Sequence, residues 1–155
     1  MDSKEFKKIF LEIAKDYGFK SAFGGSYIES DTCIFVLELQ KSNFGNYFEL
    51  NMKIYIQGAF GNKYTPNKYV IKTDMGDIFT RPLPEYHYIW ELYNDISDEE
   101  RKTKLRTFFE EYINPIQEKA LTISGIKALS TEDNDHFFIT PAVKSEIKRL
   151  YGVDV

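Results

Sequence analysis

The sequence has few residues of the kinds that build metal sites, disulfides or nucleophilic active sites. It contains one cysteine, Cys33, and two histidines, His87 and His136. A single cysteine excludes an intramolecular disulfide and a zinc site of several cysteines. The histidines lie far apart beside aromatic residues, and no calcium-binding Asp-x-Asp-x-Asp loop is present. We expect no metal site, no cofactor, no histidine acting as a general base, and a buried, unreactive Cys33.

Long apolar runs and an excess of basic charge are also absent. No stretch approaches the roughly 20 apolar residues that span a bilayer, and residues 1–5 mix acids with bases, unlike the start of a signal peptide. The net charge is −4 and the isoelectric point is near 5.3, which argues against binding to nucleic acid or anionic membranes. The phosphate-binding glycine motifs are missing too. We expect a cytoplasmic protein without nucleic-acid or membrane partners, of undetermined oligomeric state.

The residues that are present suit one globular domain with a large core. The chain has 155 residues, of which 43% are hydrophobic and 16% aromatic, and we expect residues 1–155 to form a single domain. Residues 6–17 place apolar side chains at helical spacing. Asp2 and Glu5 form a capping box before them, and Gly18 stands at a left-handed C-cap. The sequence therefore predicts an N-terminal helix.

Strand patterns follow this helix. Residues 19–29, interrupted by two glycines, predict a strand or hairpin, and residues 33–39 are apolar on both faces at first, which is typical of an inner strand. Residues 47–57 alternate, with the even-numbered side chains apolar and the odd-numbered face expected to be solvated or to contact a ligand. Residues 69–73 and 77–81 predict a second hairpin across residues 74–76.

Helical periodicity returns after Pro82. Pro84 is expected to open a short helix, and Ser97 with Glu100 to cap a longer one that Asn114-Pro115 kinks or ends. Residues 121–129 predict a helical turn, residues 132–135 a loop, and Thr140-Pro141 the start of a last helix. The sequence thus predicts the α+β class: an antiparallel sheet of about four to five strands, preceded by one helix and followed by about three helices packed on one side.

Polar residues gather after the inner strand and on one face of the next. Gln40, Lys41 and Ser42 lead into a polar turn, and Asn51 lies at mid-strand, where β propensity disfavours asparagine. Its amide needs a partner, which a ligand could supply. Together with Arg81, these are the candidate ligand-binding residues. The alternative interpretation is an ordinary turn, with Asn51 bonded to a neighbouring strand or loop.

A second candidate region spans residues 85–100, which contain six acids, no lysine or arginine, and interleaved aromatics. Acids steer a basic protein towards a surface and aromatic side chains anchor it there. The candidate partner-binding residues are Glu85, Tyr86, Tyr88, Glu91, Asp95 and Glu99. The alternative interpretation is a helix whose stripe of Tyr86, Ile89, Trp90 and Tyr93 belongs to the core and whose acids are only hydrated.

Several segments in the first half form a recognisable set. They are Tyr17-Gly18-Phe19-Lys20, Leu39-Gln40-Lys41-Ser42, Phe44-Gly45-Asn46-x-Phe48-x-Leu50-Asn51 and Asp77-x-x-x-Arg81. With them, the chain resembles the bacterial domain-of-unknown-function family DUF4304, mainly over residues 1–81. The resemblance implies no established reaction or cofactor. It implies a small bacterial cytoplasmic protein, similar in size and context to immunity proteins that neutralise toxins.

Two hypotheses for the function therefore stand. The first is a non-enzymatic module that binds another protein, such as an immunity protein that neutralises a basic toxin through residues 85–100. The second is a small-ligand-binding domain, or an enzyme of unrecognised type, that uses the polar sheet face around Gln40, Asn51 and Arg81. The two differ in geometry: the second requires these three side chains to converge on a concave pocket.

Overall fold

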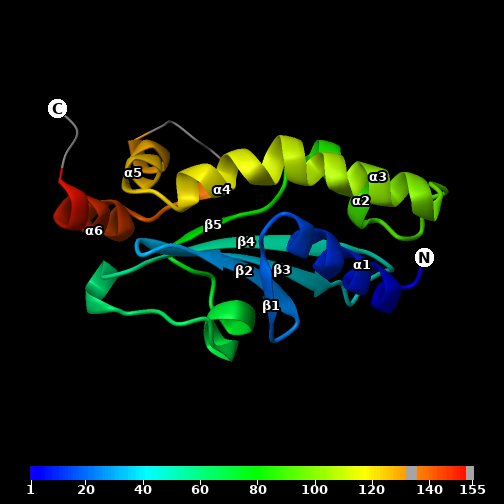
Figure 1. The fold of residues 1–155 in the computed structure, drawn as a ribbon, viewed down its shortest axis with the longest axis horizontal. Coiled ribbons are helices and arrows are strands. Elements are labelled where there is room, and N and C mark those ends of the chain that lie inside the picture. Colours follow the sequence, from blue (N-terminus) through cyan, green and yellow to red (C-terminus); the bar gives the residue numbers. More distant parts are fainter. Residues whose placement is uncertain (132–135, 153–155) are drawn as a thin grey trace.

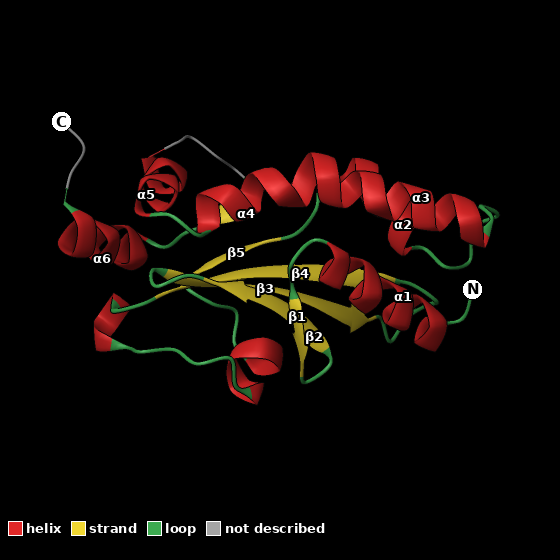
Figure 2. Ribbon diagram, viewed as in Figure 1, coloured by secondary structure: helices red, strands yellow, loops and turns green. Residues whose placement is uncertain are grey.

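The computed structural model describes residues 1–131 and 136–152, and the loop expected at residues 132–135 lies outside them. Within the described residues, helices and strands follow the expected order. The helices are α1 (Ser3–Asp16), α2 (His87–Trp90), α3 (Asp98–Phe108), α4 (Asn114–Ala120), α5 (Ile123–Thr131) and α6 (Pro141–Tyr151). The strands are β1 (Lys20–Ala22), β2 (Gly25–Glu29), β3 (Cys33–Lys41), β4 (Phe48–Ile56), β5 (Ile78–Thr80) and β6 (Phe137–Phe138). The predicted α+β class is confirmed (Figure 2).

The described strands form one antiparallel sheet in the order β1-β2-β3-β4-β5-β6. Its centre is the long β3–β4 pair, which runs from Cys33 opposite Ile56 to Lys41 opposite Phe48. The two-residue strand β6 was not anticipated, because two consecutive phenylalanines show no alternation that would predict a strand. It extends the sheet beyond β5.

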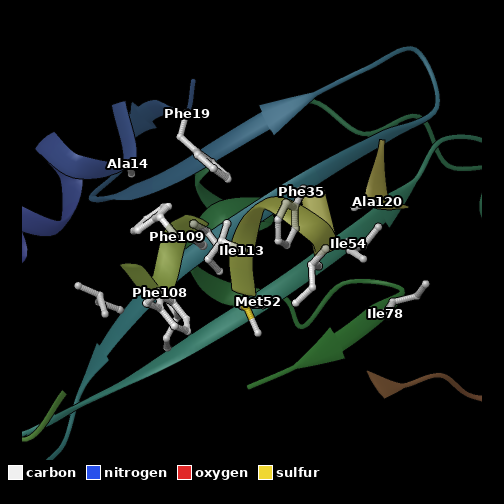
Figure 3. Close-up of a cluster of buried hydrophobic side chains, with 14 of the residues drawn as sticks. Ala14, Phe19, Phe35, Met52, Ile54, Ile78, Phe108, Phe109, Ile113 and Ala120 are labelled. Atoms are coloured by element: carbon white, nitrogen blue, oxygen red, sulfur yellow. The ribbon is translucent and has the colours of Figure 1, made fainter. Parts of the chain in front are cut away.

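One face of the sheet carries the helices and the main core. Figure 1 shows α1 and the later helices on this side, and the side chains of Phe35 and Met52 lie between the strands and the helices (Figure 3). Phe109 is a central residue of the core, because its ring contacts those of Phe10, Tyr17 and Phe19 at centroid distances of 5.5, 5.2 and 6.1 Å. The high aromatic content is therefore used mainly to fill the space between sheet and helices.

The opposite face of the sheet is covered by a single helical turn, Tyr69–Thr73, which we call the covering turn (Figure 1). The hairpin predicted for residues 69–81 is therefore wrong: only its second half is a strand, β5. The β-branched pair Val70-Ile71 favours a strand by propensity. In the structure both side chains instead pack on Ile34 and Val36 of β3, because burial overrides local preference.

The covering turn also overturns the expected exposure of β4. The odd-numbered face was predicted to be solvated or to contact a ligand, yet Asn51, Lys53 and Tyr55 are buried. The Lys53 ammonium donates to the Ile71 carbonyl at 3.0 Å, and the Tyr55 hydroxyl donates to the Val70 carbonyl at 2.7 Å. These bonds satisfy polar groups that burial would otherwise leave without partners.

The helix starts follow the predicted capping signals. Asp2, Ser97 and Thr140 each accept a hydrogen bond from the backbone amide three residues later, as N-cap residues do. The helical path does not end at Asn114-Pro115: α3 continues through a widened turn, Phe109–Ile113, into α4 (Figure 1). This continuous path supplies Phe108, Phe109 and Ile113 to the core.

Candidate functional site

The structure brings Gln40, Asn51 and Arg81 together on the face of the sheet opposite the helices. Gln40 lies near the end of β3, Asn51 lies in the middle of β4, and Arg81 directly follows β5. Since these three strands are neighbours in the sheet, their side chains lie next to one another.

Asn51 is the centre of a hydrogen-bond network. Its amide nitrogen donates to Oε1 of Glu38 at 3.1 Å and to Oε1 of Gln40 at 3.0 Å, and its oxygen accepts from Nε of Arg81 at 3.0 Å. The side chain is 6% exposed. Both polar atoms of the amide group are thus engaged, so Asn51 orients its three neighbours, and only the second lone pair of its oxygen remains for a further donor.

Lys53 extends this network inward, and sequence reasoning did not single it out as a site residue. Its side chain is only 2% exposed, and its ammonium forms an ion pair with Glu38 at 3.0 Å. A buried lysine needs such a partner, together with hydrogen bonds such as the one to Ile71, to offset desolvation. Lys53 could have been identified from its position, because it lies opposite the apolar Val36 in the central β3–β4 pair.

A pocket of about 410 Å³ opens above this network, and we call it the sheet-face pocket. It is lined by Glu38, Gln40, Asn51, Lys53, Lys72, Thr73, Asp74, Met75, Phe79 and Arg81. Arg81 forms an ion pair with Glu49 at 3.0 Å, and its guanidinium carbon lies 5.6 Å from the centroid of the Phe79 ring. Within the described residues, the amide nitrogen of Gln40 and the Lys72 ammonium have no bonding partner. The pocket therefore retains unused hydrogen-bonding groups.

The other two candidate ligand residues, Lys41 and Ser42, do not line the sheet-face pocket. The Lys41 ammonium donates to the Gly45 carbonyl at 2.8 Å, and the Ser42 hydroxyl accepts from the Phe44 amide at 3.0 Å. Both side chains hold the turn between β3 and β4, which agrees with the ordinary-turn interpretation.

The aromatic residues of segment 85–100 divide between core and surface. Tyr86 packs on Phe108 and Tyr112 at centroid distances of 5.0 and 5.1 Å, and Trp90 is buried. Tyr88 is half-buried, with the Lys104 ammonium 4.9 Å from its ring centroid. Tyr93, which was expected in the same apolar stripe, is 63% exposed because α2 ends at Trp90. The structure thus makes Tyr86 and Trp90 part of the core.

The acids of the same segment are mostly exposed. Glu85, Asp95 and Glu99 lie on the surface. Glu99 forms an ion pair with Lys102 at 3.4 Å, whereas Glu85 and Asp95 form no ion pair within the described residues. Glu91 is half-buried and forms an isolated bridge with Tyr47 at the start of β4. The exposed acids remain available to a partner, but they do not form one cluster with the buried aromatics.

Arg101 holds segment 85–100 in place, and the sequence analysis did not single it out. Its guanidinium is 2% exposed and donates to the carbonyls of Tyr88 and Ile89 at 3.0 and 2.8 Å and to Oδ1 of Asn94 at 2.6 Å. Desolvation by burial lowers its pKa. These bonds satisfy the carbonyls at the end of α2, which have no partner within that short helix.

Cys33, the one thiol considered for catalysis, lies apart from these features. Cys33 is buried, as expected, and burial, followed by the nearby Asp77 carboxylate, raises the pKa of its thiol to about 12. The thiol is therefore protonated at neutral pH and is a poor nucleophile. Among residues 1–131 and 136–152, no group of three or more His, Cys, Asp or Glu side chains is placed to hold a metal ion. In this same part of the chain no helix combines the length and the apolar character that crossing a bilayer requires.

The fold and its pocket define an α+β domain with a six-stranded antiparallel sheet in its described part, helices on one face and a polar pocket on the other. The chain belongs to the family described as "Domain of unknown function (DUF4304)", whose model matches residues 10–119. The predicted resemblance is confirmed, and the match extends past residue 81 to include α2, α3 and most of α4. Comparisons with curated proteins and with solved structures found no match.

Proposed function

We propose that this protein is a non-enzymatic binding module whose sheet-face pocket holds a small zwitterionic molecule such as a free amino acid. The observation that carries the proposal is the convergence of Gln40, Asn51 and Arg81, from three neighbouring strands, on one pocket. The convergence favours the ligand-binding hypothesis over the interpretation in which each of the three groups is satisfied separately by backbone.

The chemistry of the lining indicates the ligand class. Unused donors remain on Gln40, Lys72 and the guanidinium of Arg81, and unused acceptor capacity remains on the carboxylates of Glu38 and Asp74. A carboxylate on the ligand would find donors, and an amine would find carboxylates. The volume of about 410 Å³ lies in the range of small-molecule sites.

Thermal unfolding in the presence of each free amino acid, one at a time, tests this proposal. A ligand that binds only the folded state raises Tm, and its affinity is then measured by calorimetry. We expect Gln40→Leu, which removes an exposed pocket amide, to weaken binding at least tenfold. Lys41→Gln is the matched control, because the neighbouring side chain lies outside the pocket. Unchanged Tm with every amino acid, or equal binding by Gln40→Leu, would contradict the proposal.

A second candidate function is the binding of a basic protein, including the role of an immunity protein for a basic toxin. The observation that favours it is the exposure of Glu85, Asp95 and Glu99 on one acidic segment. Purification of bound proteins from the source cell at low and moderate salt tests this function. We expect a basic protein that is lost as salt rises, and slower association after reversal of the three charges to lysine. Recovery that is insensitive to the three reversals would contradict it.

A further inference from the structure

A second pocket, which shares Arg81 with the sheet-face pocket, lies where β5 leaves β4. The last pair of this ladder is Met52 opposite Thr80. Pro82 has no amide hydrogen with which to extend the ladder, so the chain turns away into α2. It pairs again just before β4, at the isolated bridge between Tyr47 and Glu91. The gap between these two attachment points is a pocket of about 330 Å³, which we call the aromatic pocket.

Four aromatic residues, Tyr47, Phe48, Trp90 and Tyr93, line the aromatic pocket. Trp90 is buried and fixed, because edge contacts with Phe6 and Phe108 hold its ring at centroid distances of 6.1 and 5.1 Å. Tyr93 is exposed and lies at the rim. The faces of such rings attract cations, and they attract the flat guanidinium group most readily.

The charges in the aromatic pocket favour a cation as well, because two carboxylates, Glu49 and Glu91, and one cation, Arg81, line it. Arg81 is paired with Glu49 at 3.0 Å, whereas Glu91 forms no ion pair within the described residues. Partial desolvation and then the nearby Glu91 carboxylate raise the pKa of the Tyr93 hydroxyl. The bridge places Tyr47 and Glu91 directly opposite each other, so their side chains lie on the same side of the chain pair. The lining therefore has one carboxylate without a cationic partner beside two tyrosines.

We propose that the aromatic pocket binds a guanidinium group, with Glu91 accepting hydrogen bonds from it and the tyrosines stacking on its plane. A carboxylate can accept two parallel N–H bonds from a guanidinium, a geometry that an ammonium group does not offer. The source of the group is either a free arginine-like molecule or an arginine side chain on a protein. This proposal does not rest on the zwitterion proposed for the sheet-face pocket, although Arg81 lines both pockets.

The turn that borders the aromatic pocket distinguishes the two sources. The Asn46 carbonyl of this turn accepts a hydrogen bond from the Leu92 amide at 2.9 Å, so the turn lies beside residues 91–93. At its tip, Phe44 is 94% exposed. A peptide seated in the pocket by its arginine would extend over this turn, whereas a single small molecule would not. Phe44 therefore contributes to binding only if the arginine belongs to a protein.

The experiment titrates the protein with N-acetyl-argininamide and follows Trp90, the only tryptophan of the chain, by fluorescence and by its indole N–H resonance. N-acetyl-citrullinamide, which has nearly the same shape without the charge, is the ligand control. We expect saturable binding of the arginine compound alone. Equal binding of the citrulline compound, or no response of Trp90 to either, would overturn the proposal.

Variants test the assigned residues. We expect Glu91→Gln to weaken binding at least tenfold, and Glu118→Gln, at an exposed acid of α4 outside the pocket, to leave binding unchanged. Unfolding curves establish that each variant is folded. Because Gln40 lines the sheet-face pocket and not the aromatic pocket, Gln40→Leu is expected to bind the arginine compound like the wild type, so the two proposals fail separately. Wild-type affinity in Glu91→Gln would overturn the assignment.

A short peptide with one central arginine completes the test. If the peptide binds more tightly than N-acetyl-argininamide and Phe44→Ala removes the difference, the pocket takes an arginine side chain of a protein. If the two bind equally and Phe44→Ala has no effect, the pocket takes a free molecule. Both results support a guanidinium site, whereas a failure of both compounds to bind contradicts it.

Discussion

The two faces of the sheet are buried by different means. On the helix side, apolar and aromatic side chains fill the space between the sheet and several helices. On the other side, a single five-residue turn covers the strands, and Lys53 and Tyr55 bond to its carbonyl groups. A short turn offers little apolar area, so its attachment needs hydrogen bonds from the sheet. The turn covers only part of the face, and the sheet-face pocket occupies part of the remainder.

This difference predicts how each face responds to substitution, and the largest effect is expected on the helix side. Phe109→Ala removes a ring that is packed among Phe10, Tyr17 and Phe19, so we expect the free energy of unfolding to fall by about 4 kcal/mol. Urea denaturation measures it. Phe60→Ala, at a half-exposed ring, is the control and is expected to cost less than about 1 kcal/mol. Equal losses of stability in the two variants would contradict the central role of Phe109 in the core.

On the opposite face, the largest effect is expected at Lys53. Lys53→Met leaves the Glu38 carboxylate without its cationic partner and the Ile71 carbonyl without the lysine donor, and we expect a loss of about 3 kcal/mol in the free energy of unfolding. A second substitution, Glu38→Leu, removes the orphaned charge, so the double variant should be more stable than Lys53→Met alone. If the double variant is less stable than Lys53→Met, the unpaired Glu38 charge is not the cause of the lost stability.

A smaller effect is expected where the covering turn contacts β2. A Cβ atom at Gly25 would lie 2.6 Å from Cγ2 of Ile71 and 3.3 Å from the Leu37 carbonyl oxygen. Gly25→Ala should therefore cost about 2 kcal/mol by overpacking. If the contact with Ile71 is the cause, Gly25→Ala combined with Ile71→Ala should cost less than the sum of the two single substitutions. If the two losses of stability simply add, the contact with Ile71 is not the cause of the strain at Gly25.

The smallest effect concerns pH. Desolvation by burial, opposed by bonds from the Ile56 amide and the Tyr64 hydroxyl, raises the pKa of Asp77 from 3.8. The folded state then holds the proton at pH values where the unfolded state has released it, so stability falls as pH rises through the raised pKa. Asp77→Asn removes this dependence. Urea denaturation of both proteins at several pH values should show that the wild type loses stability relative to the variant as pH rises above 3.8. If the free energies of unfolding of the two proteins change equally with pH, Asp77 is not the group responsible.

The sequence predicted most elements on the helix side of the sheet and few features of the opposite side. Helical spacing, the caps at Asp2, Ser97 and Thr140, and the alternation of β4 predicted the elements, because each depends on neighbours in the chain. The covering turn was missed because its conformation depends on contacts between Ile71 and strands distant in sequence. Local propensity at Val70-Ile71 indicated a strand instead.

The candidate site shows the same limit. Asn51 was identified because an amide in a central strand needs partners, and Gln40 and Arg81 were found with it. Lys53 and Glu38 were missed, since a lysine at an odd-numbered position of β4 is expected to be solvated until the covering turn is known. The aromatic pocket depends on the bridge between Tyr47 and Glu91, a contact across 44 positions that no local pattern indicates.

The polar ladder on β3 and β4 also has a consequence for folding. Alternating apolar residues specify which side chains face the helices, but a slip of two residues between the strands preserves that alternation. One such slip would place Glu38 opposite Glu49 instead of Asn51, with two like charges facing each other. The turn held by Lys41 and Ser42 sets the same alignment from the end of the hairpin. Polar residues therefore select one strand alignment among those that the apolar pattern alone allows.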